Sequence, residues 1–332
     1  MTQKTKTNRR QALSILGASI ACATQPAWSQ VESWKPSKPI RLLNGFAAGG
    51  SGDLICRILA EGLKPILGQS VIVETRAGAN GFIAAEAVAR SAPDGLTLGF
   101  ATMSMLAVAP QLPGVKLSIN PQTELTPIAS IANIYSLLVS SPNEPYKTVP
   151  ELIAYAKSHP GQISYASAGT GSIGHLAGEL FKRQANIDIV HVPYKGGSQA
   201  MIDLQAGRVN LLLGNMSDYL GQVKSGQLRG IAFGGDQASP QLAGLPLINK
   251  TLPEFKMENW FSIVGPARMP ETIVNALSRA IQTALADATT VKALADLGAE
   301  PMPSTPIQFQ KLIDADKKRW GDVIRAGNIR AD

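Results

Sequence analysis

Short apolar runs of strand length alternate with segments of helical periodicity through most of this chain. Such alternation is typical of α/β proteins, in which helices connect the strands of a sheet. In the first third of the chain we expect strands at 40–44, 70–74 and 96–102 and helices at 51–67 and 80–91. The pattern therefore predicts an α/β fold with mainly parallel sheets.

A second set of alternating segments begins near residue 133 and predicts a separate lobe. Its expected strands are 135–140, 163–166, 188–192, 209–213 and 228–233, and its expected helices are 149–158, 172–184, 198–206 and 217–225.

The last part of the chain is poorer in strands. It supplies one expected strand, 260–264, and three expected helices, 271–286, 290–297 and 305–326. A single strand cannot make a sheet of its own, so this part should pack back on the first lobe.

The chain would then cross between the lobes twice, near 128–134 and near 232–236. Its 332 residues, 45% of them hydrophobic, suit two lobes better than one domain. We expect lobe 1 to comprise 30–130 and 235–332 and lobe 2 to comprise 131–234, joined by a two-crossing hinge. Because ligands bind beyond the carboxyl ends of parallel strands, two facing lobes predict a cleft that binds a ligand.

The N-terminus has the order of a secretory signal. Basic residues (Lys4, Lys6, Arg9 and Arg10) precede an apolar run at 12–23, which is followed by the small residues Ala27 and Ser29. We expect a signal peptide at 1–29 and a periplasmic mature protein, with cleavage after Ala23 as the alternative. The general export route is favoured over a twin-arginine route, and ordinary cleavage over a lipoprotein anchor at Cys22.

The balance of charge excludes one class of partner. The formal net charge is +7, from 31 basic and 24 acidic residues. Four of the basic residues lie in the expected signal, which leaves 27 against 24. No stretch has the dense Lys and Arg clustering of a nucleic-acid-binding surface, so no nucleic acid partner is expected. No second apolar run is long enough to span a membrane.

Cysteine usage excludes a disulfide framework. Removal of the signal takes Cys22 with it and leaves Cys56 alone, inside an apolar helical segment. We expect Cys56 to be a small buried hydrophobic residue, and we expect no metal site built on cysteine.

Two glycine-rich loops, each between an expected strand and an expected helix, are the most informative segments. The first glycine loop (44–53) reads Asn-Gly-Phe-Ala-Ala-Gly-Gly-Ser-Gly-Asp, and the second glycine loop (166–175) reads Ala-Ser-Ala-Gly-Thr-Gly-Ser-Ile-Gly-His. Glycine lets backbone N–H groups approach a ligand, and a helix N-terminus adds partial positive charge. The loops therefore predict an anion site without a cationic side chain. The alternative is that the glycines only make tight turns.

Each loop also matches a nucleotide motif in form but not in the residues that bind the nucleotide. The first has the glycine spacing of a phosphate-binding loop, but Gly50 is followed directly by Ser51, without the lysine. The second has dinucleotide spacing at 169–174, but Asp188 precedes the next expected strand instead of ending it. We therefore expect no cofactor.

Other polar residues leave two interpretations open. Ser51 is expected to cap its helix, and Asp53 to complement the helix dipole or to orient a water molecule or a ligand donor. Thr102 and Ser104 either reach the cleft or cap a turn. His175 either points into the cleft or stabilises its helix. No histidine has a partner at metal-ligand spacing, and no serine lies in a Gly-x-Ser-x-Gly motif, so neither a metal nor a catalytic residue is expected.

Several ordered motifs resemble one family over essentially the whole expected mature chain. They are Pro36-Ser37-Lys38-Pro39-Ile40-Arg41, 46–53, Ala92-Pro93-Asp94-Gly95, 165–176, 191–196 and Leu297-Gly298-Ala299-Glu300-Pro301. They resemble the Bug family, the solute receptors of tripartite tricarboxylate transporters. The resemblance implies a type II periplasmic-binding fold, capture of a small carboxylate by loop backbone and ordered water, and membrane transporter subunits as partners.

The resemblance also implies which residues bind the ligand. The positions that match are Phe46, Ala48, Gly49, Gly50 and Ser51 in the first loop, Ser167, Gly169, Gly171, Ser172 and His175 in the second, and Thr102, Ser104 and Asn215 elsewhere; Asp53 is added from its place in the first loop.

Two departures from the family pattern bear on the ligand. Ala48 stands where proline is usual, which loosens the first loop. Gly214-Asn215 stands where an aromatic residue and an aspartate are common. The second departure removes a negative charge from the cleft, so the ligand is not expected to need a carboxylate partner there, as an amino acid's ammonium would.

The leading hypothesis is a monomeric, non-catalytic receptor for a di- or tricarboxylate or an aromatic acid. One alternative is a sensor subunit that reports the same ligand to a membrane signalling protein. Another is an exported enzyme that uses His175 or Asp53 as acid or base. Because backbone and water contacts carry little side-chain information, the sequence does not identify the carboxylate.

Overall fold

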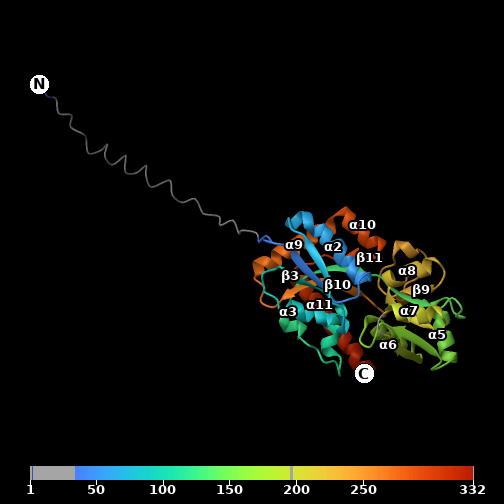
Figure 1. Cartoon of the computed structure of the whole chain (residues 1–332). Helices are drawn as coiled ribbons and strands as arrows, with labels where there is room; N and C mark the ends of the chain where they lie inside the picture. Colours follow the sequence, from blue (N-terminus) through green and yellow to red (C-terminus); the bar gives the residue numbers. More distant parts are fainter. Residues whose placement is uncertain (1, 3–33, 195–196, 332) are drawn as a thin grey trace. The chain divides into compact units, whose positions relative to one another are not determined.

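The structure is a computed structural model that describes Thr2 and residues 34–194 and 197–331. The expected signal peptide, apart from Thr2, and Lys195 lie outside the described residues. Lys35–Asp332 forms one compact unit. It contains two sheets with helices packed on both, which makes two α/β lobes (Figure 1).

The first sheet has the strand order β11-β4-β10-β3-β1-β2. The bounds of its strands are β1 Ile40–Asn44, β2 Val71–Thr75, β3 Thr97–Thr102, β4 Leu125–Ile134, β10 Asn259–Pro266 and β11 Ala299–Pro301. β1 pairs in parallel with β2 and β3, whereas β10 lies antiparallel between β3 and β4. The returning C-terminal part therefore completes the first lobe, as expected.

The second sheet has the order β7-β6-β8-β5-β9. Its strands are β5 Ser136–Ser140, β6 Ile163–Ser167, β7 Ile189–Pro193, β8 Leu211–Asn215 and β9 Arg229–Phe233. β6 is parallel to β7 and β8, and β5 is antiparallel to β8 and β9.

The helices of each lobe cover its own sheet (Figure 1). Around the first sheet lie α2 Ser51–Leu67, α3 Phe82–Ala89, α4 Pro121–Glu124, α9 Glu271–Ala286, α10 Ala288–Asp296 and α11 Pro306–Gly327, and around the second lie α5 Val149–Ser158, α6 Ile173–Ala185, α7 Gly197–Gln205 and α8 Met216–Lys224. Short π and 3-10 turns, η1 Ala79–Gly81, η2 Ser104–Val108, η3 Ala109–Gln111, η4 Pro240–Leu242 and η5 Ile248–Lys250, complete the set.

Helix bounds agree with the sequence where local stop and start signals are strong. α5 begins after Thr148, whose side chain forms a reciprocal capping box with Glu151. α2 ends at Gly68, which adopts the left-handed conformation at φ 67°. The bounds expected for α2, α5 and α9 are confirmed.

The expectation of mainly parallel sheets is wrong. Both sheets are mixed, because β10 and β5 run against their neighbours. Hydrophobic periodicity distinguishes a strand from a helix, but it carries no information on the direction in which a strand enters its sheet.

The first crossing between the lobes lies at the end of the expected range, and the second lies later in the chain than expected. Residues 128–134 are not a linker, since they belong to β4, and the chain passes to the second lobe at Tyr135. After β9 it stays against the second lobe, where Phe233 N–H donates to Pro246 and Leu247 packs on the second core. It enters the first sheet only at β10.

Buried side chains link the first core to the first glycine loop. Phe100, on β3, packs edge-on against both Phe46 and Phe261. Cys56 is fully buried in α2, as expected. α11 contacts both β4 of the first lobe and α6 of the second, so the C-terminal helix touches both lobes.

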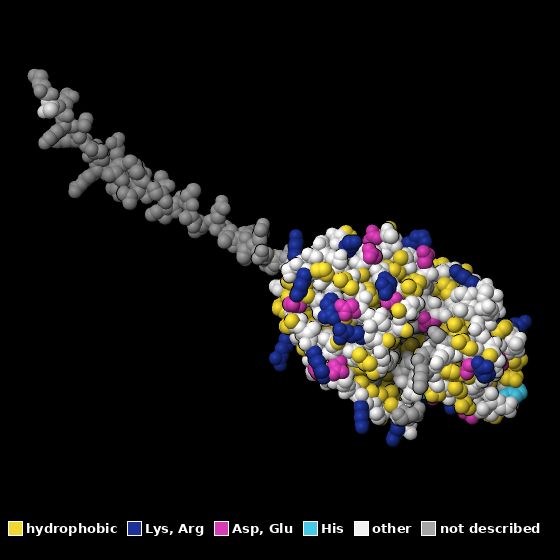
Figure 2. Space-filling model, viewed as in Figure 1, with side chains coloured by type: hydrophobic (Ala, Val, Ile, Leu, Met, Phe, Trp, Pro, Cys, Tyr) yellow, Lys and Arg dark blue, Asp and Glu magenta, His cyan; other side chains and the backbone are white. Residues whose placement is uncertain are grey.

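The face in Figure 2 carries basic and acidic side chains interspersed among uncharged ones. Across the part of the chain that the structure describes, no helix combines the length and the apolar character needed to cross a membrane.

Candidate functional site

The candidate site lies at the carboxyl ends of parallel strands in both lobes. In the first lobe β1 runs into the first glycine loop and β3 ends at Thr102. In the second lobe β6 runs into the second glycine loop and β8 ends at Asn215. Parallel pairing of β1 with β3 and of β6 with β8 brings these ends to one edge of each sheet.

The buried side chain of Asn44 shapes the start of the first loop. Its Oδ1 accepts from the Phe46 N–H and its Nδ2 donates to the Phe46 carbonyl, both at 3.1 Å. This pair of bonds holds Phe46 half-buried against Phe100, while Ala48, Gly49 and Gly50 are exposed. The sequence prediction did not include Asn44, which sets the loop's path.

Asp53 closes the first loop on itself. The buried carboxylate accepts from the Gly49 N–H at 3.1 Å and from the Arg57 guanidinium at 2.9 Å. Burial alone would raise the pKa of Asp53, but the hydrogen bonds from Arg57 and Gly49 outweigh it and lower the pKa. Asp53 therefore stays ionised and anchors the loop; a ligand contact by Asp53 remains a prediction.

The N-terminus of α2 is open toward the site. The residue before the helix is Gly50, and no side chain caps it. The first N–H groups of a helix have no intrahelical partner, so those of α2 can bind an anion. The expectation that Ser51 caps this helix is wrong, because Ser51 is already inside the helix. Its hydroxyl lies near Asp218 and favours the ionised form of that carboxylate.

Ser167 braces the second loop. Its hydroxyl is buried at the end of β6, donates to the Gly169 carbonyl at 3.1 Å, accepts from the Gly169 N–H at 3.2 Å, and lies 2.7 Å from Nε2 of His191. Ser172 is the N-cap of α6, and its hydroxyl accepts from the His175 N–H at 3.4 Å.

His175 ties the second loop to α6. Its Nδ1 accepts from the Gly171 N–H at 3.0 Å, which assigns the proton of the neutral ring to Nε2. The ring is buried and stacks on His191, with centroids 3.9 Å apart. Burial, and after it the electrostatic effect of the neighbouring His175, lower the pKa of His191 to about 3, so His191 is neutral near pH 7. The helix-stabilising interpretation of His175 is thus supported, and a ligand contact stays a prediction.

Two glycines of the second loop are required by geometry. Gly171 has φ 77°, and a Cβ there would lie 2.6 Å from Leu112 Cδ2 of the first lobe. A Cβ on Gly174 would lie 2.3 Å from the Leu213 carbonyl oxygen, so this glycine lets α6 pack on β8. The dinucleotide-like spacing therefore has a packing cause, and Gly171 lies where the lobes meet.

Thr102 and Ser104 follow β3. The buried Thr102 hydroxyl oxygen accepts from the Met105 N–H at 3.3 Å, which is the turn-capping role. Ser104 is the first residue of the π-helix η2 and is also buried. Such a one-turn π-helix often marks a functional position. Whether either hydroxyl also reaches a ligand remains a prediction.

Asn215 connects the lobes. Its Oδ1 accepts from Nδ2 of Asn259, on β10 of the first lobe, at 2.8 Å. Its Nδ2 donates to Asp218 at 3.4 Å.

The sequence prediction missed Asp218 and Asn259. Asp218 lies in the first turn of the helix that follows β8. The rule that ligands bind beyond the carboxyl ends of strands would therefore have found it, if we had applied that rule to the helix after β8 as well. No local signal marks Asn259. The premise that the cleft lost its negative charge with Gly214-Asn215 does not hold, since Asp218 supplies a carboxylate beside Asn215.

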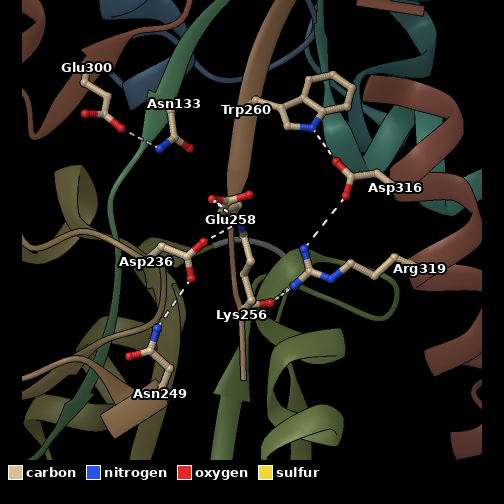
Figure 3. A network of polar contacts seen from close by, with 9 residues as sticks. All are labelled: Asn133, Asp236, Asn249, Lys256, Glu258, Trp260, Glu300, Asp316 and Arg319. Atoms are coloured by element: carbon tan, nitrogen blue, oxygen red, sulfur yellow. Dashed lines mark hydrogen bonds and ion pairs between the residues drawn. The ribbon is translucent and has the colours of Figure 1, made fainter. Parts of the chain in front are cut away.

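A second group of polar side chains lies where the chain passes between the sheets (Figure 3). The Lys256 ammonium pairs with Asp236 at 2.5 Å and with Glu258 at 2.8 Å, and Arg319 of α11 donates to the Lys256 carbonyl. Burial would lower the pKa of Lys256, but the two carboxylates outweigh it and raise the pKa. These contacts hold the return crossing against α11.

The cavity beside this network has a volume of about 250 Å³. Glu300, which lines it, accepts from Asn133 at 2.8 Å (Figure 3). It also accepts from the Tyr135 hydroxyl at 3.2 Å. The other acidic side chains that line it, Asp236 and Glu258, pair with Lys256. Its acids are therefore engaged in bracing the crossings, which favours the strand-end site as the place where a ligand binds.

Comparisons with known proteins agree with this geometry. Residues 55–329 match the family model described as "Tripartite tricarboxylate transporter family receptor". Protein BugT of Bordetella pertussis is 33% identical over 324 residues, which cover 96% of this chain and 98% of that protein.

Two similar solved structures contain small dicarboxylic acids. Rpa4515 of R. palustris with adipate is 31% identical, has a TM-score of 0.83, and is matched over 90% of this chain and 99% of that one. MatC (Rpa3494) from Rhodopseudomonas palustris with bound malate is 29% identical, has a TM-score of 0.77, and is matched over 87% and 99%. The resemblance to the Bug receptors is confirmed: the chain belongs to the receptor family of tripartite tricarboxylate transporters.

Proposed function

We propose that this chain is a solute-binding receptor that captures a small carboxylate between its lobes and delivers it to the membrane subunits of a transporter. One observation carries the proposal. The open N-terminus of α2 lies at the strand ends of the first sheet, the second glycine loop lies at the strand ends of the second, and Leu112 of the first lobe lies against Gly171 of that loop. Adipate and malate in the related structures are acids of the class that such a site would bind.

The candidate residues divide into two roles in this proposal. The backbone N–H groups of Ala48 and of the first turn of α2, with the polar groups of Ser51, Ser172 and Asn215, would meet the ligand directly or through water. Gly49, Gly50, Gly169 and Gly171 would let the loops approach the ligand closely, while their own N–H groups bond within the loops. Side chains that already bond to the loops would hold them in place, namely those of Phe46, Asp53, Thr102, Ser104, Ser167 and His175.

Several further properties belong to the proposal. Family members are periplasmic binding proteins that work with membrane subunits. We propose that 1–29 is removed on export, that the lobes of the first and the second sheet are the two bodies that close on the ligand, and that the mature protein is a monomer. The bounds expected for the bodies, 30–130 with 235–332 and 131–234, shift so that all of β4 moves with the first sheet and the chain between β9 and β10 moves with the second. Sedimentation of the mature protein and mass spectrometry of its N-terminus test the monomer and the cleavage site.

We further propose that the receptor leaves its ligand chemically unchanged. His175 Nδ1 is occupied by the Gly171 N–H, and Asp53 is paired with Arg57, so neither group is poised as a base. The bound acid should be recovered unaltered after prolonged incubation. A new product whose amount grows with protein concentration would favour the enzyme.

A thermal-shift screen tests the binding function. The mature protein is heated with succinate, malate, glutarate, adipate, citrate and benzoate, with the dimethyl esters of the diacids as uncharged controls. A ligand at one hundred times its dissociation constant stabilises the folded state by about 2.7 kcal/mol, which a melting curve resolves. If no acid raises the melting temperature and titration calorimetry detects no binding, the receptor function is wrong.

A further inference from the structure

The Asp218 carboxylate lies among three helix N-termini. It belongs to the first turn of α8, and the hydroxyl of Ser51, the first residue of α2, lies near it and favours its ionised form. Its Oδ2 would be 3.9 Å from a Cβ on Gly197, the first residue of α7. A carboxylate of the protein itself therefore stands beside the place where the site gathers positive partial charge.

Neutral groups alone meet this carboxylate among the described residues. They are the Ser51 hydroxyl and Nδ2 of Asn215, at 3.4 Å, and no ion pair within 34–194 and 197–331 includes Asp218. The side chain is half-buried, and burial raises its pKa to about 6. A partly desolvated carboxylate without a cation is unfavourable unless another donor reaches it.

Among the described residues, the other charged side chains at this edge of the sheets are already engaged. Asp53 of the first loop is paired with Arg57 within α2. Asp203, on α7, is paired with Arg208 and accepts from the Tyr194 hydroxyl. Asp218 is thus the carboxylate of this edge that retains the capacity to accept from a ligand.

We propose that Asp218 is a specificity-determining residue that selects acids carrying a hydrogen-bond donor, a hydroxyl or an ammonium group, beside the carboxylate. The inference rests on the proposed function of the cleft. The acid's carboxylate binds the backbone N–H groups, and its donor bonds to Asp218. An unsubstituted acid leaves Asp218 without that donor and places two carboxylates close together, which repel each other.

Matched acids that differ in one substituent test this inference. Succinate, malate and aspartate form one set, and adipate, 2-hydroxyadipate and 2-aminoadipate form another; if another acid binds best in the screen, a third set is built on it. Titration calorimetry at pH 7.5 should show that a donor-bearing member binds the wild-type receptor at least about tenfold more tightly than its parent.

Two substitutions separate the two kinds of donor. Asp218→Ala removes the acceptor and should reduce either preference to within about threefold. Asp218→Asn keeps an acceptor oxygen but no charge, so it should lose a preference for ammonium and retain part of a preference for hydroxyl. Asp188→Asn is the matched control: Asp188 directly precedes β7, at the end of that strand opposite the site, and pairs with Lys182. It should keep the wild-type preference.

The outcomes separate this inference from the receptor function. If the parent acids bind the wild type as tightly as the substituted acids, or if Asp218→Ala retains the preference while circular dichroism shows it folded, the selection by Asp218 is wrong and the receptor function stands. If parent acids bind more tightly at pH 5 without any preference, Asp218 takes up a proton in place of a ligand donor, which also overturns the inference. If no carboxylate binds at all, the receptor function fails and the inference fails with it.

Discussion

Nδ2 of Asn259, on the first lobe, donates to Oδ1 of Asn215, on the second, at 2.8 Å. This bond holds the carboxyl ends of the two sheets against each other, and the Ser51 hydroxyl of the first lobe lies near the Asp218 carboxylate of the second, where it favours the ionised form. Both pairs use side chains at positions where a ligand would bind. The same contacts therefore bear on stability, on closure of the lobes and on ligand selection.

The first prediction concerns the folding stability that is lost when Asp218 is ionised. Its pKa is raised from 3.8 to about 6 in the folded protein, so the folded state loses stability relative to the unfolded state as pH rises through this range. Asp218→Asn, which keeps the acceptor but not the charge, should be more stable than the wild type by about 2 kcal/mol at pH 7.5 and by little at pH 4. Urea unfolding at both pH values measures this. An equal gain at pH 4 and pH 7.5 would contradict the titration as its cause.

The second prediction concerns Gly171, where the second loop meets Leu112 of the first lobe. Gly171→Ala should destabilise the fold by about 1 kcal/mol because of its positive φ. It should also weaken ligand binding at least about tenfold, since the added Cβ collides with Leu112 only when the lobes are together. Gly171→Val should be worse on both measures.

Two variants control the Gly171 experiment. Gly226 has φ 76° with open space around it, so Gly226→Ala should match the stability loss and leave affinity unchanged. Leu112→Ala should restore part of the affinity in the Gly171→Ala background. Equal affinity losses in Gly226→Ala and Gly171→Ala would show that the contact between lobes is irrelevant.

Lys195→Ala, a change at a residue outside the described ones, should weaken binding by about 1 kcal/mol or less if backbone groups hold the anion.

The third prediction concerns acid stability. His191 has its pKa lowered from 6.5 to about 3, so the unfolded chain takes up a proton first as the pH falls below 6.5. The folded state should therefore lose about 1 to 2 kcal/mol between pH 7 and pH 5 through this residue. His191→Gln, which can still bond to the Ser167 hydroxyl, should flatten that part of the stability profile. If the stability of the variant falls between pH 7 and pH 5 as steeply as that of the wild type, groups other than His191 cause the loss.

The fourth prediction concerns closure. A ligand that bridges the loops of both lobes should favour the closed arrangement in solution, because it binds that arrangement better. Small-angle scattering with a saturating carboxylate should give a smaller radius of gyration than without it. An unchanged radius for a tightly bound acid would mean that the receptor is already closed, as the Ser51 to Asp218 contact would permit, and the hinge proposal would fall.

The sequence by itself determined the elements and the kind of site. Apolar runs, the Thr148 capping box and the Gly68 stop signal are local, so α2 and α5 end where expected. The two glycine loops likewise identify themselves by composition and by their place between strand and helix. The ordered motifs along the chain were enough to identify the family, because each motif is a run of residue types that needs no knowledge of the fold.

Only the tertiary structure decided what those elements do to one another. Residues 128–134 have the same apolar pattern whether they link two lobes or lie in β4, and their partner β10 is far away in the sequence. In the sequence, Asp218 has only the features of an aspartate in the first turn of a helix. The tertiary structure alone places Ser51 of the other lobe near it. In the sequence, Gly171 is one of several loop glycines. Only the tertiary structure places Leu112 against it. Strand direction and contacts between lobes depend on which distant residues meet, and local periodicity does not encode that.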